Sequence, residues 1–144
     1  MLTVLPTNYN TNSMQTLVKK FPFPDTAEHS LIFSMIPIAL SNVPFHNNTK
    51  SITRYFAEDF PFHLAVHEVS PVTVPPIEYT EPHLHEDWDE INLIISQHDL
   101  LYRIQLDDEK YTVTNNSSIW IPRGTVHAAN VLRGSGYFIT IRVQ

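Results

Sequence analysis

The sequence predicts an all-β protein, and three observations support this fold class. The chain of 144 residues contains eleven prolines, which break helices but are tolerated at strand ends and in turns. Short runs in which apolar and polar residues alternate recur along the chain, and Asn, Asp and Pro separate them. Only residues 14–21 have much helical character, and this segment is short. We therefore expect an architecture built from sheets.

The length indicates a single domain. A folded chain of this length buries roughly two-thirds of the surface that it would expose when unfolded. The first 30 residues are rich in Asn, Thr and Pro and are expected to form an irregular N-terminal arm, so the domain is assigned to residues 31–144. Cysteine is absent, and the chain therefore has no disulfide framework.

Each predicted strand is a short run of alternating or β-branched residues bounded by turn residues. The run at 31–40 is the most apolar stretch of the chain, and the run at 62–69 alternates clearly. The sequence Leu-Asp-Asp-Glu-Lys at 106–110 is expected to form a hairpin turn. In order, the predicted strands cover residues 31–40, 51–56, 62–69, 72–74, 78–85, 90–96, 100–106, 110–114, 118–121, 125–131 and 136–143.

Charge and hydropathy exclude several classes of partner. The formal net charge is −6 and the nine Lys and Arg residues are scattered, so nucleic acid is not an expected partner. The apolar run at 31–40 is too short to span a bilayer and contains Pro37. The N-terminus lacks the basic region and apolar run of a signal peptide. We expect a soluble, cytoplasmic protein.

One constellation of residues points to a metal. The pattern His83-x-His85-x4-Glu90 is followed 37 residues later by His127. Side chains two residues apart on an extended chain point to the same side, so His83 and His85 can aim at one point, and Pro82 favours that extended backbone. Other acids at positions 86, 87 and 89 flank Glu90, and spacing alone does not decide between them. Three imidazoles and one carboxylate can supply the protein ligands of one divalent metal.

These residues resemble the two motifs of the cupins, small β-barrels of the jelly-roll type. The first cupin motif is Gly-x5-His-x-His-x3 or 4-Glu-x6-Gly, and the second is Gly-x5-Pro-x-Gly-x2-His-x3-Asn. The matching positions in this chain are His83, His85 and Glu90 for the first motif and Pro122, Gly124 and His127 for the second. The resemblance covers residues 62–142.

The chain departs from the motifs mainly at their glycines. The first motif would have Gly at positions 77 and 97, where this chain has Ile and Gln. Asn116 stands where the second motif opens with Gly, and Asn tolerates the left-handed backbone that such a turn requires. Asn130 comes one residue early. The set of ligand residues is intact.

The resemblance implies a double-stranded β-helix, or jelly-roll barrel, that binds one divalent metal per chain. The implied metal ligands are His83, His85, Glu90 and His127. Four protein ligands leave about two open positions on a six-coordinate ion such as Fe(II), Mn(II), Co(II) or Ni(II), and Zn(II) is also possible. The resemblance favours Fe(II) among them. Open positions are what an enzyme uses to bind a substrate, water or O2.

The walls of the pocket should come from residues on the same side as the ligands. By the period of two, Tyr79 and Glu81 share the side of His83 and His85, so we name both as the candidate catalytic acid or base.

Three further residues leave alternatives open. Arg142 is a candidate to meet a substrate anion or, alternatively, an exposed residue near a strand end. His63 and His67 would lie about 13 Å apart on one strand, so one metal cannot bind both. His67 could reach the pocket rim as an acid or base, or could be a solvated or hydrogen-bonded strand histidine.

The expected function is that of a cupin metalloenzyme whose substrate is a small oxygen-rich organic molecule that chelates the metal. A non-heme Fe(II) dioxygenase is favoured, because three His with one Glu is a common ligand set of iron oxygenases among single-domain cupins. One alternative is a non-redox lyase, isomerase or polyketide-type cyclase, and another is a non-catalytic cupin that binds or senses a small ligand. We also expect a homodimer, because a small jelly roll leaves sheet edges and an apolar face for a second copy to cover.

Overall fold

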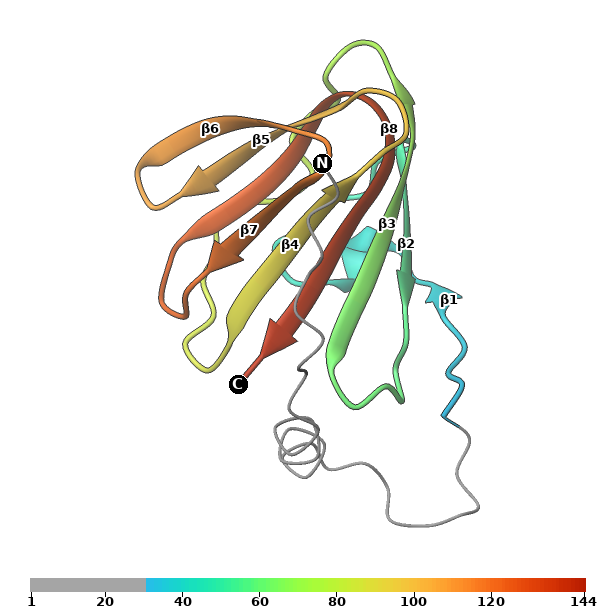
Figure 1. The fold of residues 1–144 in the computed structure, drawn as a ribbon, viewed down its shortest axis with the longest axis vertical. Coiled ribbons are helices and arrows are strands. Elements are labelled where there is room, and N and C mark those ends of the chain that lie inside the picture. Colours follow the sequence, from blue (N-terminus) through green and yellow to red (C-terminus); the bar gives the residue numbers. More distant parts are fainter. Residues whose placement is uncertain (1–30) are drawn as a thin grey trace, which may run out of the picture. The chain divides into compact units, whose positions relative to one another are not determined.

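A computed structural model describes residues 31–144 of the chain. The predicted arm at 1–30 and the predicted helix at 14–21 lie outside the described residues. In chain order the elements are β1 (Ile36–Pro37), the 3-10 helix η1 (Leu40–Asn42), β2 (Ile52–Phe56), β3 (His63–Val72), β4 (Asp89–Ile95), β5 (Leu100–Leu106), β6 (Glu109–Thr114), β7 (Ser117–Ile121) and β8 (His127–Val143) (Figure 1). The all-β prediction is confirmed.

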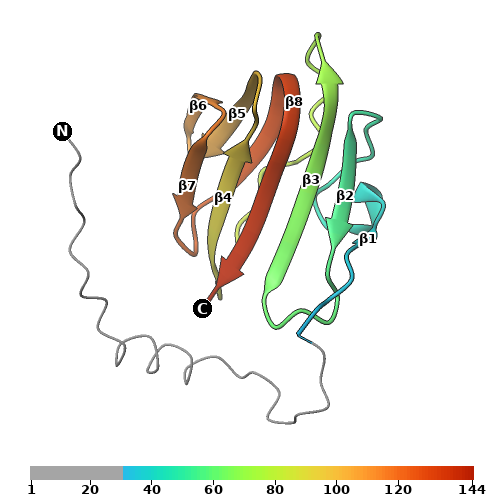
Figure 2. The ribbon, with the colours of Figure 1, turned by 45° about the vertical axis from the view of Figure 1, so that its right-hand side comes forward.

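The fold is organised around the 17-residue strand β8. The sheet has the order β1-β2-β3-β8-β4-β7, and β5 pairs with both β8 and β6. Every strand pairing is antiparallel. The C-terminal part of β8 lies between β3 and β4, whereas its N-terminal part pairs with β5 (Figure 2). One long strand therefore ties the β5–β6 hairpin to the larger sheet.

Two glycines join the halves of β8, where the sequence predicts two separate strands. Gly134 and Gly136 have φ angles of +95° and +148°, a region that L side chains rarely adopt. A Cβ at Gly134 would lie 1.9 Å from the carbonyl oxygen of Asp99, so the close approach of these two backbones requires glycine. β5 stays paired with β8 on both sides of a register shift at Leu101/Tyr102, so β8 does not end there. The strands predicted at 125–131 and 136–143 are therefore parts of one strand.

Most other strand predictions correspond to an element, from β2 through β7. The prediction at 31–40 is wrong for most of its length, because only the two residues of β1 form a strand there, and η1 follows. Pro37 cannot donate a backbone hydrogen bond, and β1 accordingly pairs on one side only, as the sheet's edge strand. Among the residues that the structure describes there is no helix with the length and apolar character that a membrane crossing requires.

The hydrophobic core occupies one part of the barrel interior, and polar residues follow it along the same strands. Phe138 of β8 pairs with Ile94 of β4, and both side chains are buried. Two residues further along, Thr140 pairs with Asn92, and next Arg142 pairs with Glu90. Side chains two apart on a strand share a face, so the interior changes from apolar to polar along the strands. The buried core residues are Leu40, Ile52, Val69, Val72, Tyr79, Ile94, Leu100, Tyr102, Ile104, Ala129, Val131 and Phe138.

Asn130 fastens the segment between β3 and β4 to β8. Its side-chain oxygen accepts hydrogen bonds from the backbone N–H groups of Tyr79 and Thr80, at 2.8 and 3.0 Å. Its amide nitrogen donates to the Thr80 carbonyl at 3.0 Å. Asn130 is buried, so these bonds are shielded from water. They hold the start of the segment that continues to His83 and His85.

Asn130→Ala should lower the free energy of unfolding by about 3 kcal/mol, because it leaves two backbone N–H groups and one carbonyl without their partner in the interior. Denaturant titration measures the change. The control is Asn48→Ala, which removes an exposed amide that is hydrogen-bonded to Ser41 and should cost less than about 1 kcal/mol. Equal losses in the two variants would contradict this role for Asn130.

The predicted homodimer stays a prediction, and β1 is where we expect the contact. Ile36 on this edge strand is 45% exposed. Light scattering at tens of micromolar protein should give twice the mass of one chain, and Ile36→Asp should shift the protein toward the monomer. Val74→Asp, at a site that is 75% exposed, is the matched control and should remain dimeric. A monomer mass for the unchanged protein would refute the prediction.

Candidate metal centre

His83 and His85 lie on the segment that joins β3 to β4. The predicted strand at 78–85 is wrong, because only two isolated bridges form here, between Thr80 and His46 and between His83 and His127. Pro82 interrupts this segment and has no N–H to donate, so it cannot take part in a continuous ladder. The segment is nevertheless extended enough to keep the two histidines on the same side.

Backbone hydrogen bonds place this segment against the start of β8. The His83 N–H donates to the His127 carbonyl at 3.0 Å, and the His127 N–H donates to the His83 carbonyl at 2.7 Å. The Gly124 N–H donates to the His85 carbonyl at 2.7 Å. Gly124 has a φ of +80°, a turn conformation that suits glycine. Residues 39 and 44 positions apart in the chain are thereby fixed side by side.

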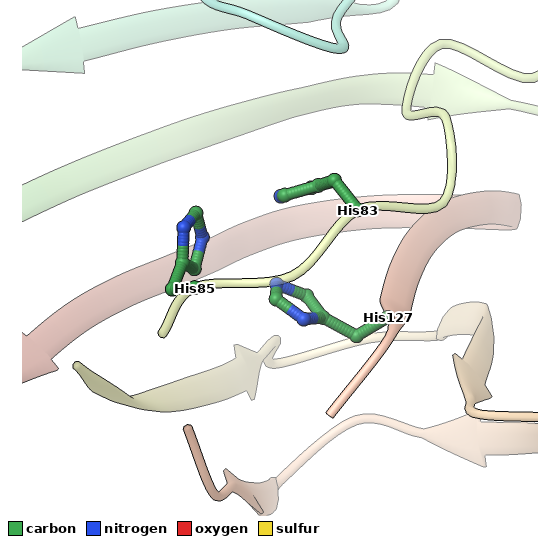
Figure 3. Close-up of side chains that lie close together, drawn as sticks. All are labelled: His83, His85 and His127. Carbon is green, nitrogen blue, oxygen red and sulfur yellow. The ribbon is translucent and has the colours of Figure 1, made fainter. Parts of the chain in front are cut away.

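The three imidazole rings converge (Figure 3). Their centroids are 4.5 Å apart for His83 and His127, 5.1 Å for His83 and His85, and 5.2 Å for His85 and His127. One nitrogen from each ring can be chosen so that all three lie within 4.8 Å of one another. The structure thus brings together the three histidines that the sequence singled out.

Two of the rings are oriented by backbone carbonyls. Nδ1 of His83 lies 2.8 Å from the Glu81 carbonyl oxygen, and Nδ1 of His127 lies 3.0 Å from the Thr125 carbonyl oxygen. A carbonyl oxygen only accepts hydrogen bonds, so each Nδ1 carries the proton and each Nε2 keeps its lone pair. Second-shell contacts of this kind set the tautomer of metal-binding histidines.

Glu90, at the start of β4, lies beside the triad. Its Oε2 is 3.4 Å from His85 Nε2, and its Oε1 is 3.6 Å from His127 Nε2. Asn92 donates a hydrogen bond to Oε1 at 2.9 Å, and Arg142 donates one to Oε2 at 3.1 Å. Burial alone would raise the pKa of Glu90, but its polar and charged neighbours outweigh burial and lower the pKa, so this carboxylate is ionised.

Two of the three histidines, His83 and His127, are held neutral. Burial is the main cause that lowers the pKa of His83 to about 4, although its backbone hydrogen bond works in the opposite direction. Burial is also the main cause that lowers the pKa of His127. Both imidazoles therefore stay deprotonated at neutral pH, which is the form that binds a metal.

These features fit a divalent metal. Nε2 of His85 and Nε2 of His127 are buried and have no hydrogen-bond partner. An unpaired buried polar atom is costly, and a metal ion would satisfy both lone pairs at once. Neutral imidazole nitrogens beside an ionised carboxylate are a donor set that suits Fe(II), Zn(II) and the other first-row ions named above.

Two cavities that share wall residues lie beside the triad. The first, called the inner cavity below, is about 40 Å³, which holds a group of the size of a water molecule or slightly larger. An adjoining space of about 310 Å³ shares some of the same walls and reaches His85. The shared wall residues are Val43, His63, His83 and Arg142. Together the two spaces can hold a small organic molecule.

The inner cavity includes side chains that the sequence analysis did not assign to the site. His46 comes from the loop after η1, Arg54 from β2, and Thr140 from β8. Each of these residues lies outside the two motif segments, and pairing with distant parts of the chain places it here. The period-two pattern identifies the face of one strand, but it does not reveal which strands adjoin.

Of the two predicted catalytic residues, one lines the inner cavity and the other lies outside it. Tyr79 lines the inner cavity and is 1% exposed, and its hydroxyl donates to the Tyr102 hydroxyl at 3.1 Å. The side chain of Glu81 is exposed, accepts a hydrogen bond from Asn47 at 3.2 Å, and is absent from the cavity lining. Their catalytic roles stay predictions.

The open alternatives for three other residues are resolved in part. Arg142 lines the cavity and pairs with Glu90, so it is not a free strand-end residue. His63 and His67 both line the cavity as well, on one face of β3. His67 is buried, which excludes the solvated alternative.

A comparison of the sequence with protein-family models finds no match, and neither does a comparison with curated proteins. Solved structures do match. The Fe(II) form of HppE superposes with a TM-score of 0.57 at 10% sequence identity, covering 81% of this chain and 62% of that one. The polyketide cyclase RemF from Streptomyces resistomycificus gives a TM-score of 0.51 at 22% identity, covering 83% and 80%.

A further match is an RmlC-like cupin from Shewanella frigidimarina, with a TM-score of 0.48, 12% identity and coverage of 81% and 91%. At such identities, likeness establishes the fold alone, and we base it on the two matches with the higher scores. Both are cupin-type proteins. Residues 31–144 therefore have the fold of the cupin superfamily, as the two histidine motifs predict.

Proposed function

We propose that this chain is a metal-dependent cupin enzyme that acts on a small oxygen-rich organic molecule. The observation that carries the proposal is the convergence of three imidazoles, two of them with buried and unpartnered Nε2 atoms, at the wall of a cavity. A purely structural metal site would have no need of an adjoining space that can hold a small molecule.

In this proposal His83, His85 and His127 bind the metal, and Glu90 is the fourth ligand. The short distances from the Glu90 oxygens to two of the imidazoles support that choice. Among the neighbouring acids, the Asp89 carboxylate is engaged by Arg123 at 3.1 Å, and Asp87 is exposed. The bonds from Asn92 and Arg142 hold the Glu90 carboxylate in place.

We favour a non-heme Fe(II) dioxygenase as the chemistry. When bound, Fe(II) would supply the activation of O2 that such a reaction needs. The chain's own part is to hold the ligand nitrogens in the reactive tautomer and to limit water to a small, mostly buried space. A substrate would enter through the wider space beside Phe45 and His85.

The second candidate is a non-redox lyase, isomerase or polyketide-type cyclase, and the protonation of the cavity residues supports it. Burial raises the pKa of Tyr79, so its hydroxyl keeps its proton and suits a donor. Burial lowers the pKa of His63 to about 4, so its imidazole is neutral and can accept a proton. A cupin that only binds or senses a ligand is the third possibility, and absence of turnover with any ligand that binds would favour it.

His127→Ala should abolish stoichiometric metal binding, because it removes a ligand whose Nε2 is buried and has no hydrogen-bond partner. Metal analysis of protein purified without chelators is the measurement, with circular dichroism to verify the fold. Glu90→Gln should weaken binding, whereas Asp87→Asn, its matched control, should not. One metal ion per chain in His85→Ala/His127→Ala would refute the ligand assignment.

The two chemistries differ in their need for O2. A dioxygenase loaded with Fe(II) should consume O2 in step with substrate, and the Zn(II)-loaded protein should be inert. An oxygen electrode combined with product analysis measures this. Undiminished turnover by the Zn(II) form without air would end the dioxygenase proposal and leave the non-redox one.

In the non-redox case Tyr79→Phe should lower kcat by about 10²-fold if its hydroxyl is the acid. The same test applies to Glu81→Gln, although its exposed carboxylate lies outside the cavity. Metal content is measured in both variants, so that a loss of rate is not confused with a loss of metal.

A further inference from the structure

Among residues 31–144, Arg54 is a buried cation with no ion pair. Its side chain is 6% exposed and lines the inner cavity. Within residues 31–144 its guanidinium makes no hydrogen bond and no ion pair, and its recorded contact is with the ring of Phe56, whose centroid is 4.7 Å from Cζ. Burial of an unpaired charge is expensive, so native proteins rarely keep one without a purpose.

The neighbouring charges make burial of the Arg54 guanidinium still less favourable. Burial and, after it, the positive charge of Arg142 lower the pKa of Arg54. Arg142 itself is neutralised by Glu90, with which it forms a hydrogen bond of 3.1 Å. The sequence singled out Arg142 as the residue to meet an anion, but within residues 31–144 it is the guanidinium of Arg54 that has no anionic partner.

His67 supplies a second unsatisfied group beside Arg54. The two residues are directly paired in the β2–β3 ladder, and both line the inner cavity. His67 is buried, and its Nδ1 has no hydrogen-bond partner. Burial, followed by the charge of Arg54, lowers the pKa of His67 to about 3, so the ring is neutral and can donate one N–H.

The cavity between these groups and the metal histidines is kept open by small side chains. Ala65 of β3 and Thr140 of β8 pair across the sheet. This pair lies between His67 on one side and the pair of Arg142 and Glu90 on the other. Ala129 lines the same space. The ring of His46 lies 6.3 Å from that of His67 and 5.8 Å from that of His83. Arg54 and His67 line the same inner cavity as His83 and His127.

We propose that Arg54 and His67 form a binding site for an oxyanion group of the substrate, a carboxylate or a phosphate, at the end of the cavity away from the metal histidines. The guanidinium offers a planar fork that matches either oxyanion, and stacking on Phe56 orients it. This rests on the proposed function, and it narrows the substrate class to small organic acids or phosphate esters.

The test is anion binding to the full-length protein in its metal-free and Zn(II)-loaded forms, measured by calorimetry and thermal denaturation. Malonate and inorganic phosphate are the probes, and they distinguish a carboxylate site from a phosphate site. We expect one of them to bind the metal-free protein and raise its Tm, because a ligand that binds only the native state stabilises it. Arg54→Met should weaken that binding about 10- to 100-fold. His67→Phe should weaken it by a smaller factor.

The control is Arg103→Met, which removes an arginine that already pairs with Glu78 outside the cavity and should leave anion binding unchanged. Without anion, Arg54→Met should have an unchanged or higher Tm, because it removes an uncompensated charge. Arg54→Lys keeps the charge without the fork and should bind with intermediate affinity. If Arg54→Met does not fold, the comparison of Arg54→Lys with the unchanged protein decides.

Metal content is measured in each variant to separate this inference from the proposed function. Equal anion affinity in the unchanged protein and in Arg54→Met, with metal retained, would overturn the oxyanion site and leave the metal centre intact. Anion binding that depends on Arg54 in a protein that takes up no metal would support the oxyanion site and refute the metalloenzyme. Failure of both probes to bind either form would also overturn the oxyanion site.

Discussion

The candidate site depends on one reciprocal pair of backbone hydrogen bonds, between His83 and His127. This pair joins the segment between β3 and β4, which has no regular strand structure, to His127, the first residue of the longest strand. Because both partners carry imidazoles, the same two bonds that fasten the segment also determine the distance between two ring nitrogens. Asn130 fastens the earlier part of the segment to β8, so the position of His85 follows from contacts made several residues away.

A second constraint is the division of the interior along the strands. The inner faces of β4 and β8 are apolar at Ile94 and Phe138 and polar at Glu90 and Arg142. Burial of polar groups costs stability unless they are paired. In the described part of the chain Glu90 is paired, whereas Arg54, His67 Nδ1 and two imidazole Nε2 atoms are not. The apolar end of the barrel must offset that cost, and a bound metal and anion would reduce it.

The sequence predicts the all-β class, the cupin fold and the convergence of three histidines, because period-two spacing and the two motifs are local features. It does not reveal that Arg54 lies beside His67, since strand register between β2 and β3 depends on packing of the whole sheet. It also places Glu81 on the same side as His83 and His85, because side chains two apart on a regular strand share a side. That spacing does not hold around Pro82, where the chain makes only isolated bridges. The merging of two predicted strands into β8 likewise depends on the approach of Asp99 to Gly134, which is a long-range contact.

The most direct test of the account is X-ray absorption spectroscopy of the full-length protein loaded with one equivalent of Zn(II) or Co(II). The account predicts about three imidazole ligands, with metal–nitrogen distances near 2.0–2.1 Å, and lighter oxygen ligands completing the shell. Replacement of His127 by Ala should remove the signal of a three-histidine site. A spectrum with one imidazole or none, or one unchanged by that replacement, would contradict the metal centre described here.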